Sequence, residues 1–527
     1  MYKVIICDKL SDEAIEIFNS NAIEVDVKLG LLEDEILAII NDYDGIAVRS
    51  ATKITDKILT KAKNLKIVGR AGIGVDNIDI KSATKNGVIV MNAPFGNSIT
   101  TAEHAITLIL SLARKIPQAH MSTISSKWEK SKFIGTEIFG KKLGIIGCGN
   151  IGTIVAQRAQ ALKMKVLGYD PFLNDEKAEE IGIQKVSLDE LLSKSDFITL
   201  HTPLTEKTRN IISADAINKT KKGIRIVNCA RGGLIDENAL KVGLESGHVA
   251  GAAIDVFKEE PAINNPLFKA PNIVVTPHLG ASTKEAQEKV AIQIAEQMSD
   301  FLKTGAVSNS INMASVSSEE APILLPYMKL GELLGSFLGQ VKTENLKNFT
   351  LEFDGKASRL NTSPILSSSL AGFLNSSFDS VNMVNSVSLA ESKGIDISIS
   401  QHDRRCNYES LLRITIEYDN GKRTVAGTLF GGNLPRIVEV QGISFEASFP
   451  NNLLYLRNYD QPGFIGSLGS LMGDLGINIA NFHLGRKSIG GEAISLIEVD
   501  QEVKEETLIA IKKLPQIVRA DYLQFDL

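Results

Sequence analysis

The stretch LGIIGCGNIG, residues 143–152, joins a short β-branched run to a segment with helical spacing of apolar residues, 150–163. It is a Gly-x-Gly-x-x-Gly motif with a strand before it and a helix after it. Gly147 permits the tight turn, and Gly149 leaves room for a pyrophosphate at the start of the helix. Gly152 lets the helix and the strand pack closely. The stretch therefore predicts a Rossmann-like unit that binds a dinucleotide.

The next predicted strand, 165–170, ends in Asp170. A carboxylate at this point accepts hydrogen bonds from both ribose hydroxyls of an adenosine, and it repels a 2′-phosphate. The following residues, Pro171 and Phe172, supply no arginine to hold such a phosphate. The predicted cofactor is therefore NAD and not NADP.

Around this unit, the first 310 residues alternate short β-branched runs with helical patterns, which predicts an α/β fold with parallel sheets covered on both faces. Two such units are expected. A substrate-binding lobe takes residues 1–97 and 285–308, and an NAD-binding Rossmann domain takes 98–284. Two long apolar helices, 100–114 and 283–305, are expected to carry the chain between the lobes.

The C-terminal third has a different composition. Residues 309–450 carry serine clusters and weak periodicity, and no motif with chemistry of its own. A cluster of His402, Arg404 and Arg405 is interpreted as a solvated loop in preference to an anion site. Residues 451–527 return to a compact pattern of β-α-β-β-α-β, which predicts a ferredoxin-like module.

Composition excludes several classes of protein. The chain has 57 Lys and Arg against 62 Asp and Glu, a net charge of −5, so nothing in the overall charge favours nucleic acid. No apolar run approaches the ~20 residues of a membrane span, and the first apolar run, 3–8, is typical of a strand and not of a signal peptide. The four cysteines, Cys7, Cys148, Cys229 and Cys406, form no metal-binding spacing and are expected to be buried thiols in a reducing cytoplasm.

Three residues follow separate predicted strands of the second unit: Arg231, Glu260 and His278. Ligands of an open parallel sheet bind at the carboxyl ends of its strands, so these side chains are expected at one edge. His278 is the natural base for oxidising a secondary alcohol, and Glu260 is expected to fix its tautomer. Arg231 is expected to bind a substrate carboxylate and polarise the reacting oxygen.

Other histidines compete for the role of base. His201 also ends a predicted strand, but no acidic segment accompanies it as plainly, so it ranks second to His278. His104 lies within an apolar helical pattern and is expected to be a packed residue.

The motifs GCGNIG, LHTPLT, VNCARGGLIDE, DVFKEEP and TPHLGAST together resemble those of the D-2-hydroxyacid dehydrogenase family, and VRSATK and VGRAGIGVDNID of the first lobe add to the resemblance. The whole chain is similar to long members of that family that end in an intervening domain and an ACT domain. The resemblance implies that Arg231, Glu260 and His278 are the catalytic set. Besides Gly147, Gly149 and Gly152, it implies these cofactor-binding positions: Asn150, Ile151, Asp170, Thr202, Cys229, Ala230, Arg231, Asp255, His278, Gly280 and Ala281.

The resemblance also implies residues for the substrate. Arg49 and Arg70 match positions that meet a carboxylate or phosphate, and a phosphorylated substrate needs more positive charge than Arg231 provides. Backbone near Gly72 and Asn97 is expected to line the cleft. Lys130 resembles a basic residue lent to the site of a neighbouring subunit.

In the ACT segment, the matching effector positions are Asn458, Asp460 and Asn478. The resemblance implies L-serine as the effector, and the side chains suit it: Asp460 can hold an α-amino group, and the asparagines a carboxylate and a hydroxyl. The alternative is a dimerisation module without a ligand.

As a whole, the resemblance implies NAD-dependent oxidation of D-3-phosphoglycerate to 3-phosphohydroxypyruvate, the first step of phosphorylated L-serine biosynthesis, by a cytoplasmic homo-oligomer, with a tetramer favoured. Two alternatives stay open. One is a reductase of glyoxylate or hydroxypyruvate, and the other is a non-catalytic NAD-sensing scaffold.

Overall fold

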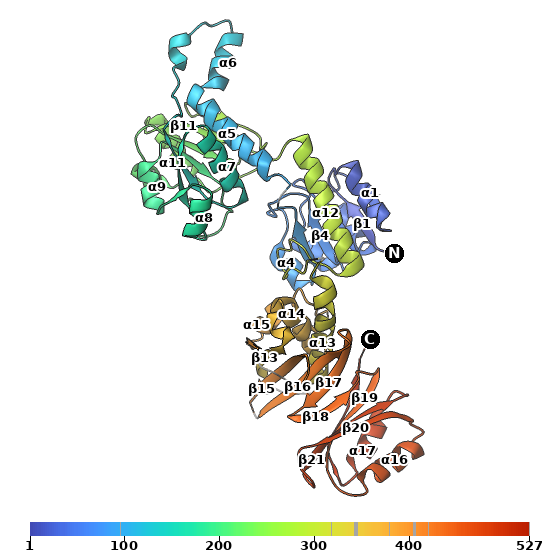
Figure 1. Cartoon of the computed structure of the whole chain (residues 1–527). Coiled ribbons are helices and arrows are strands. Elements are labelled where there is room, and N and C mark those ends of the chain that lie inside the picture. The colour runs from blue at the N-terminus through green and yellow to red at the C-terminus, as the bar shows by residue number, and fades with distance from the viewer. Residues whose placement is uncertain are drawn as a thin grey trace.

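The computed structural model describes residues 1–94, 96–317, 319–341, 346–378, 380–403, 407–419 and 421–525. These residues form four sheets in an elongated arrangement. Figure 1 shows the two N-terminal lobes at one end and in the middle, and the two C-terminal sheets at the other end. Arg404, Arg405 and Cys406, which entered the predictions above, lie outside the described residues.

The first lobe is a five-stranded parallel sheet in the order β2-β1-β3-β4-β5. Its strands are β1 (Lys3–Ile6), β2 (Glu24–Val27), β3 (Gly45–Val48), β4 (Ile67–Arg70) and β5 (Ile89–Asn92). The helices between them are α1 (Asp12–Ser20), α2 (Glu33–Ile39), α3 (Asp56–Lys61) and α4 (Ile80–Lys85). The strands β3 and β5 are buried along their whole length, as expected for a sheet covered on both faces.

The second lobe is a seven-stranded parallel sheet in the order β12-β11-β10-β9-β6-β7-β8. Its strands are β6 (Lys142–Ile146), β7 (Lys165–Tyr169), β8 (Gln184–Lys185), β9 (Phe197–Leu200), β10 (Ile224–Asn228), β11 (Val249–Ile254) and β12 (Ile273–Val275). Its helices are α7 (Asn150–Ala161), α8 (Asp175–Glu180), α9 (Leu188–Lys194), α10 (Ala214–Lys219) and α11 (Glu237–Glu245). The chain order reverses at β6, between β9 and β7, and such a switch point is where open α/β sheets bind ligands. The predicted two-lobed fold with parallel sheets is confirmed.

Two long helices connect the lobes (Figure 1). α5 (Ser98–Arg114) leaves the first lobe after β5 and packs on α7 of the second. α12 (Lys284–Thr304) returns and packs along α1. Between α5 and β6 the chain forms an arm that projects from the second lobe, built of α6 (Ile116–Ile124) and the 3-10 turn η2 (Lys130–Phe133).

The third sheet has the order β14-β13-β15-β16-β17-β18 and is antiparallel except where β13 pairs with β14. Its elements are α13 (Ala321–Gln340), β13 (Leu346–Gly355), α14 (Thr362–Leu374), α15 (Ser386–Ser392), β14 (Asp396–His402), β15 (Ser410–Tyr418), β16 (Gly421–Phe430), β17 (Leu434–Val440) and β18 (Ile443–Ala447). This is the α+β intervening domain that the fold prediction contained.

The serine cluster that looked weakly periodic in the sequence is buried within α14, where it meets α13. The two helices can approach closely because Gly335 has no side chain. A Cβ atom there would lie only 2.0 Å from the carbonyl oxygen of Ser369. Ser369 Oγ donates to the carbonyl of Ile365 in its own helix, so burial leaves this hydroxyl with a partner.

The fourth sheet has the predicted β-α-β-β-α-β order, with strands paired antiparallel as β20-β21-β19-β22. Its elements are β19 (Asn452–Tyr459), α16 (Phe464–Asp474), β20 (Ile479–Arg486), β21 (Glu492–Val499), α17 (Glu505–Lys512) and β22 (Ile517–Gln524). The ferredoxin-like prediction is confirmed.

The returning chain closes the free edge of β5. Asn312 Oδ1 accepts the amide of Val90 at 2.9 Å, and its Nδ2 donates to the carbonyl of Val88 at 2.9 Å and to Thr84 Oγ1 at 3.1 Å. Together with the backbone bonds from Ile311 to Val90 and from Asn92 to Asn309, this side chain satisfies an edge strand whose chain continues into the cleft described below.

We expect Asn312→Ala to lower the melting temperature of the first lobe by a few degrees. The loss of partners for two partly buried backbone groups costs about 1–3 kcal/mol, and each kcal/mol shifts the midpoint by about 2–4 °C in a domain of this size. Differential scanning calorimetry measures the shift, with Asn218→Ala on exposed α10 as the matched control. Equal melting temperatures for the two variants would contradict the role given to Asn312.

Candidate functional site

The glycine turn between β6 and α7 has the geometry of a dinucleotide site. Gly147 has φ +94°, which favours glycine, and a Cβ atom at Gly152 would lie 2.1 Å from the Gly147 carbonyl oxygen. No atom lies within 4 Å of a Cβ built at Gly149, so the backbone there is open to a ligand. The carboxylate of Asp170 accepts the amide of Cys148 at 2.8 Å, so it lies beside this turn. These residues fit NAD.

A cavity of about 380 Å³ lies where the two lobes face each other. Its lining combines strand-end residues of the second lobe with residues that follow β4 and β5 of the first. Of the predicted site residues it contains Arg70, Asn97, Asn150, Ile151, Thr202, Cys229, Ala230, Arg231, His278, Gly280 and Ala281.

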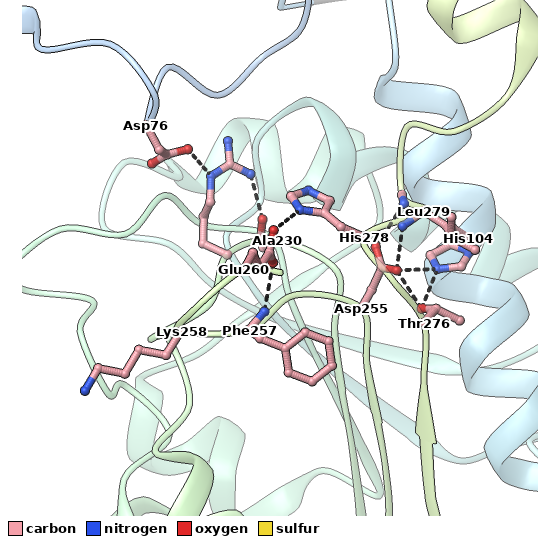
Figure 2. A network of polar contacts seen from close by, with 12 residues as sticks. Asp76, His104, Ala230, Asp255, Phe257, Lys258, Glu260, Thr276, His278 and Leu279 are labelled. Atoms are coloured by element: carbon pink, nitrogen blue, oxygen red, sulfur yellow. Dashed lines mark hydrogen bonds and ion pairs between the residues drawn. The ribbon is translucent and has the colours of Figure 1, made fainter. Parts of the chain in front are cut away.

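His278 and Glu260 form a close pair at this cavity (Figure 2). His278 Nδ1 and Glu260 Oε2 lie 2.7 Å apart, and the other carboxylate oxygen accepts the amide of Phe257 at 2.9 Å. The hydrogen bond with Glu260 raises the pKa of His278 above its usual value. Burial by itself raises the pKa of Glu260, but the hydrogen bonds from His278 and Phe257 outweigh it and leave that pKa low. The pair is therefore an imidazole held by an ionised carboxylate.

The turn that carries His278 is held by Asp255. His278 has φ +55°, in the left-handed region, and its amide donates to the backbone oxygen of Asp255 at 2.9 Å. The Asp255 carboxylate is fully buried and accepts the amides of Leu279 and Gly280 at 2.7 and 2.9 Å, together with Thr276 Oγ1 at 2.5 Å. This network keeps the backbone of His278 in an unfavourable conformation.

His104 does more than pack, which is all that the sequence predicted for it. From α5 its Nε2 lies 3.3 Å from Asp255 Oδ1 and 3.4 Å from Thr276 Oγ1 (Figure 2). Burial raises the pKa of Asp255, but hydrogen bonds, with that from His104 the largest, outweigh burial and keep the acid ionised. His104 was missed because a helical apolar pattern does not reveal which neighbour a single polar residue meets.

His201 also lines the cavity, but burial lowers its pKa to about 3. Its Nε2 lies 2.9 Å from Thr199 Oγ1. A histidine in this environment is a much weaker proton acceptor than His278, in agreement with the predicted ranking.

The first lobe contributes positive charge through Arg70. Burial, and then the nearby charge of Arg231, lower the pKa of Arg70 to about 10, and its Nε is buried without a hydrogen-bond partner in the described residues. A Cβ atom at Gly72 would lie 1.6 Å from Arg70 Nη1, so glycine makes room for the guanidinium. This buried cation is suited to an anionic group of a ligand.

Other predicted substrate residues do not line the cavity. The backbone amide of Arg49 donates to Asp8 Oδ2 at 2.6 Å, and its Nη1 donates to the carbonyl of Lys9 at 3.4 Å. Lys130 is exposed in η2, on the projecting arm.

The three predicted effector residues already have internal partners. Asn458 is buried and its Oδ1 accepts Ser495 Oγ at 3.0 Å. Asp460 accepts Arg486 Nη1 at 2.7 Å, which lowers the pKa of its carboxyl. Asn478 donates to Asp500 at 2.6 Å.

The described residues hold no group of three or more His, Cys, Asp or Glu side chains arranged to bind a metal ion. They also hold no helix that is long and apolar enough to span a membrane.

Three family models match the chain in order. Residues 106–280 match the NAD-binding domain of D-isomer-specific 2-hydroxyacid dehydrogenases, residues 323–441 match the intervening domain of D-3-phosphoglycerate dehydrogenase, and residues 453–516 match the ACT domain. The chain is thus an NAD-dependent dehydrogenase of the 2-hydroxyacid class, with an NAD-binding domain and an ACT module, as the sequence predicted.

Curated relatives extend the match over the whole length. The D-3-phosphoglycerate dehydrogenases of Bacillus subtilis and Methanocaldococcus jannaschii are each 42% identical to this chain over 521 residues, which is 98% of this chain and 98% of each relative. The chain belongs to the D-3-phosphoglycerate dehydrogenase family, and the predicted resemblance is confirmed.

Solved structures match about three fifths of the chain. PH0520 protein from Pyrococcus horikoshii is 33% identical, with a TM-score of 0.53, over 59% of this chain and 95% of that one. NAD-dependent formate dehydrogenase from Staphylococcus aureus, solved with NAD, is 28% identical, with a TM-score of 0.54, over 60% of this chain and 100% of that one. The NAD-bound relative supports the cofactor assigned from the glycine turn.

We expect Glu260→Gln to lower the pKa of His278, because the carboxylate whose hydrogen bond raises it becomes a neutral amide. Titration of ¹³Cε1-labelled histidine by NMR measures the pKa, with the signal assigned through His278→Asn. Glu259→Gln, one residue away and exposed, is the matched control and should leave the pKa unchanged. A pKa of His278 that is the same in both variants would contradict the pairing.

Proposed function

We propose that this protein oxidises D-3-phosphoglycerate to 3-phosphohydroxypyruvate with NAD, the first step of phosphorylated L-serine biosynthesis. The observation that supports this best is the cavity that joins the His278–Glu260 pair of one lobe to Arg70 of the other, whose Nε is buried without a hydrogen-bond partner among the described residues. The names of the relatives in Bacillus subtilis and Methanocaldococcus jannaschii agree with this substrate.

In the proposed mechanism, Arg231 binds the substrate carboxylate and polarises the oxygen on C2. Neutral His278 takes the proton of the C2 hydroxyl, and ionised Glu260 stabilises the imidazolium that forms. NAD, when bound, accepts the hydride from C2. Asp255 holds the 278–280 turn so that the imidazole stays in place.

The cofactor assignments follow the geometry of the second lobe. We assign the pyrophosphate to the turn of Gly147, Gly149 and Gly152 with Asn150 and Ile151, and the ribose to Asp170. We assign the nicotinamide end to these residues: Thr202, Cys229, Ala230, Arg231, Asp255, His278, Gly280 and Ala281. The support is that the cavity between the lobes is lined by most of this second group.

The phosphate of the substrate is assigned to the first lobe. Arg70 is the main partner, since its guanidinium lies in the cavity wall with an unpaired Nε. Asn97, whose Oδ1 is buried without a partner among the described residues, lines the same cavity. Gly72 is not in the lining itself, but the two residues after it, Ile73 and Gly74, are. Arg49, whose Nη1 now donates to the carbonyl of Lys9, is proposed to turn toward the phosphate when the lobes close.

The direction of the pH dependence follows from the raised pKa of His278. Oxidation needs the neutral imidazole, so its rate rises with pH through that pKa. Reduction needs the imidazolium, so its rate falls as the pH rises through the same value. Loss of the Glu260 carboxylate moves both transitions to lower pH.

We propose the following division of the chain into domains. We assign residues 1–97 and 285–308 to the substrate-binding lobe, 98–284 to the NAD-binding domain, 309–450 to the intervening domain and 451–527 to the ACT domain.

We propose L-serine as the effector of the ACT domain, bound near Asn458, Asp460 and Asn478. The support is the ACT match and the polar character of these three side chains. Because Asp460 is paired with Arg486, serine has to compete with that ion pair for the carboxylate.

We propose a homo-oligomer, with a tetramer favoured, in the cytoplasm. The projecting arm exposes large apolar side chains, with Trp128 87% exposed and Ile124 61% exposed, and such a surface is typical of a protein–protein contact. Lys130 lies two residues beyond Trp128, so a partner that covers this arm brings Lys130 near a second subunit.

The test of the function is NADH consumption with 3-phosphohydroxypyruvate, with hydroxypyruvate as the control substrate and with or without millimolar L-serine. A strong preference for the phosphorylated ketoacid supports the proposed substrate, and inhibition by serine supports the proposed effector. Equal use of both ketoacids would favour the general hydroxyacid reductase. No turnover of either would favour the non-catalytic scaffold.

We expect Arg70→Gln to raise KM for 3-phosphohydroxypyruvate about 10- to 100-fold, since a hydrogen bond to a charged group is worth about 1.5–3 kcal/mol. KM for hydroxypyruvate, which has no phosphate, should change much less. Arg209→Gln, an exposed arginine paired with Glu206, is the control. An equal rise for both ketoacids would contradict phosphate recognition by Arg70.

A further inference from the structure

One ion pair crosses the cleft between the lobes. Asp76 lies in the loop between β4 and α4 of the first lobe, and Arg231 follows β10 of the second. Arg231 Nε and Asp76 Oδ2 lie 2.9 Å apart (Figure 2). Asp76 belongs to the VGRAGIGVDNID motif, but the sequence offered no reason to single it out.

The contacts around Arg231 fix the plane of its guanidinium. Nε donates to Asp76, and Nη1 donates to the carbonyl of Ala230 at 2.6 Å. Nη2 lies against the backbone of Gly74. Only glycine leaves room for it, since a Cβ atom at this position would be 1.9 Å from Nη2. A guanidinium has five N–H donors, so those left without a described partner are on Nη1 and Nη2. This end of the group is the fork that binds a carboxylate with two parallel hydrogen bonds.

The positive charge of Arg70 repels Arg231 in this position, so a nearby acid is needed to hold Arg231 there. The charge of Arg231 lowers the pKa of Arg70, and so does that of Arg49, whereas Asp76 raises it. Two cations, Arg70 and Arg231, therefore line one cleft with Arg49 close enough to act on Arg70, and Asp76 is an acid in the lining of the same cleft. Asp8 also raises the pKa of Arg70, but less than Asp76 does. Asp76 has a side chain that is 68% exposed, so the pair adds little to the stability of the fold. Its effect is on where the guanidinium points.

We propose that Asp76 is a positioning residue that holds Arg231 across the cleft with its Nη1–Nη2 end free for the carboxylate of the substrate. The proposal rests on the role given to Arg231 in the proposed function. The loop after β4 then has two roles. Gly72 leaves room for Arg70, and Asp76 and Gly74 orient Arg231 of the opposite lobe.

The experiment compares Asp76→Asn and Asp76→Ala with Asp34→Asn, which removes the same charge from exposed α2 of the same lobe. Calorimetry measures binding of D-3-phosphoglycerate to enzyme saturated with NADH, a pair that does not react. Steady-state kinetics measure KM and kcat for 3-phosphohydroxypyruvate and KM for NADH.

We expect the dissociation constant for phosphoglycerate and KM for the ketoacid to rise about tenfold in Asp76→Asn and further in Asp76→Ala, since asparagine keeps an oxygen that can accept from Nε. KM for NADH and the melting temperature should match those of Asp34→Asn. A purely structural role of Asp76 would instead lower the melting temperature and leave the dissociation constant unchanged.

Two results would overturn the proposal. A dissociation constant equal to that of Asp34→Asn would show that Asp76 does not act on the substrate site. Tighter binding in Asp76→Asn would show that Asp76 competes with the substrate for Arg231. Wild-type enzyme that binds phosphoglycerate but reduces no ketoacid would reject the proposed function, and the binding comparison would still decide the role of Asp76.

Discussion

The site depends on one strained turn, the segment 278–280, because it aims the imidazole of His278 into the cleft. The left-handed backbone of His278 is maintained by hydrogen bonds to Asp255, whose carboxylate is completely buried. Burying an ionised acid is unfavourable unless its oxygens are fully hydrogen-bonded. The two amides of the turn, Thr276 and His104 supply those bonds. The same hydrogen bonds therefore offset both the cost of the buried charge and the strain of the turn.

The two lobes bring different functional groups to the cleft in which that turn lies. The second lobe supplies the imidazole–carboxylate pair and Arg231, while the first lobe supplies Arg70 and Asp76. Helix α5 begins at the cavity and reaches Asp255 through His104 within its first two turns, so the connection between the lobes is also part of the site. Closure of the lobes therefore changes the distance between Arg70 of the first lobe and His278 of the second.

Much of this was predictable because the decisive signals are local. The glycine turn with Asp170, the strand ends with Arg231 and His278, and the β-α-β-β-α-β order all lie within short stretches of sequence. What escaped prediction depends on contacts between distant segments. His104 meets Asp255, Asp76 meets Arg231, and the serines of α14 are buried only because Gly335 lets two helices approach. Arg49 and Lys130 were inferred from resemblance, and neither lines the cavity in this arrangement of the lobes.

The most direct test of the account follows the hydrogen on C2 of the substrate. Enzyme with NAD would be given D-3-phosphoglycerate deuterated at C2, with the ketoacid trapped, and the reduced cofactor would be analysed by mass spectrometry. The account predicts one deuterium in each NADH formed, transferred directly from C2, and a strong loss of this transfer in His278→Asn. NADH without deuterium, or undiminished transfer in His278→Asn, would contradict a reaction carried out by this pair in this cleft.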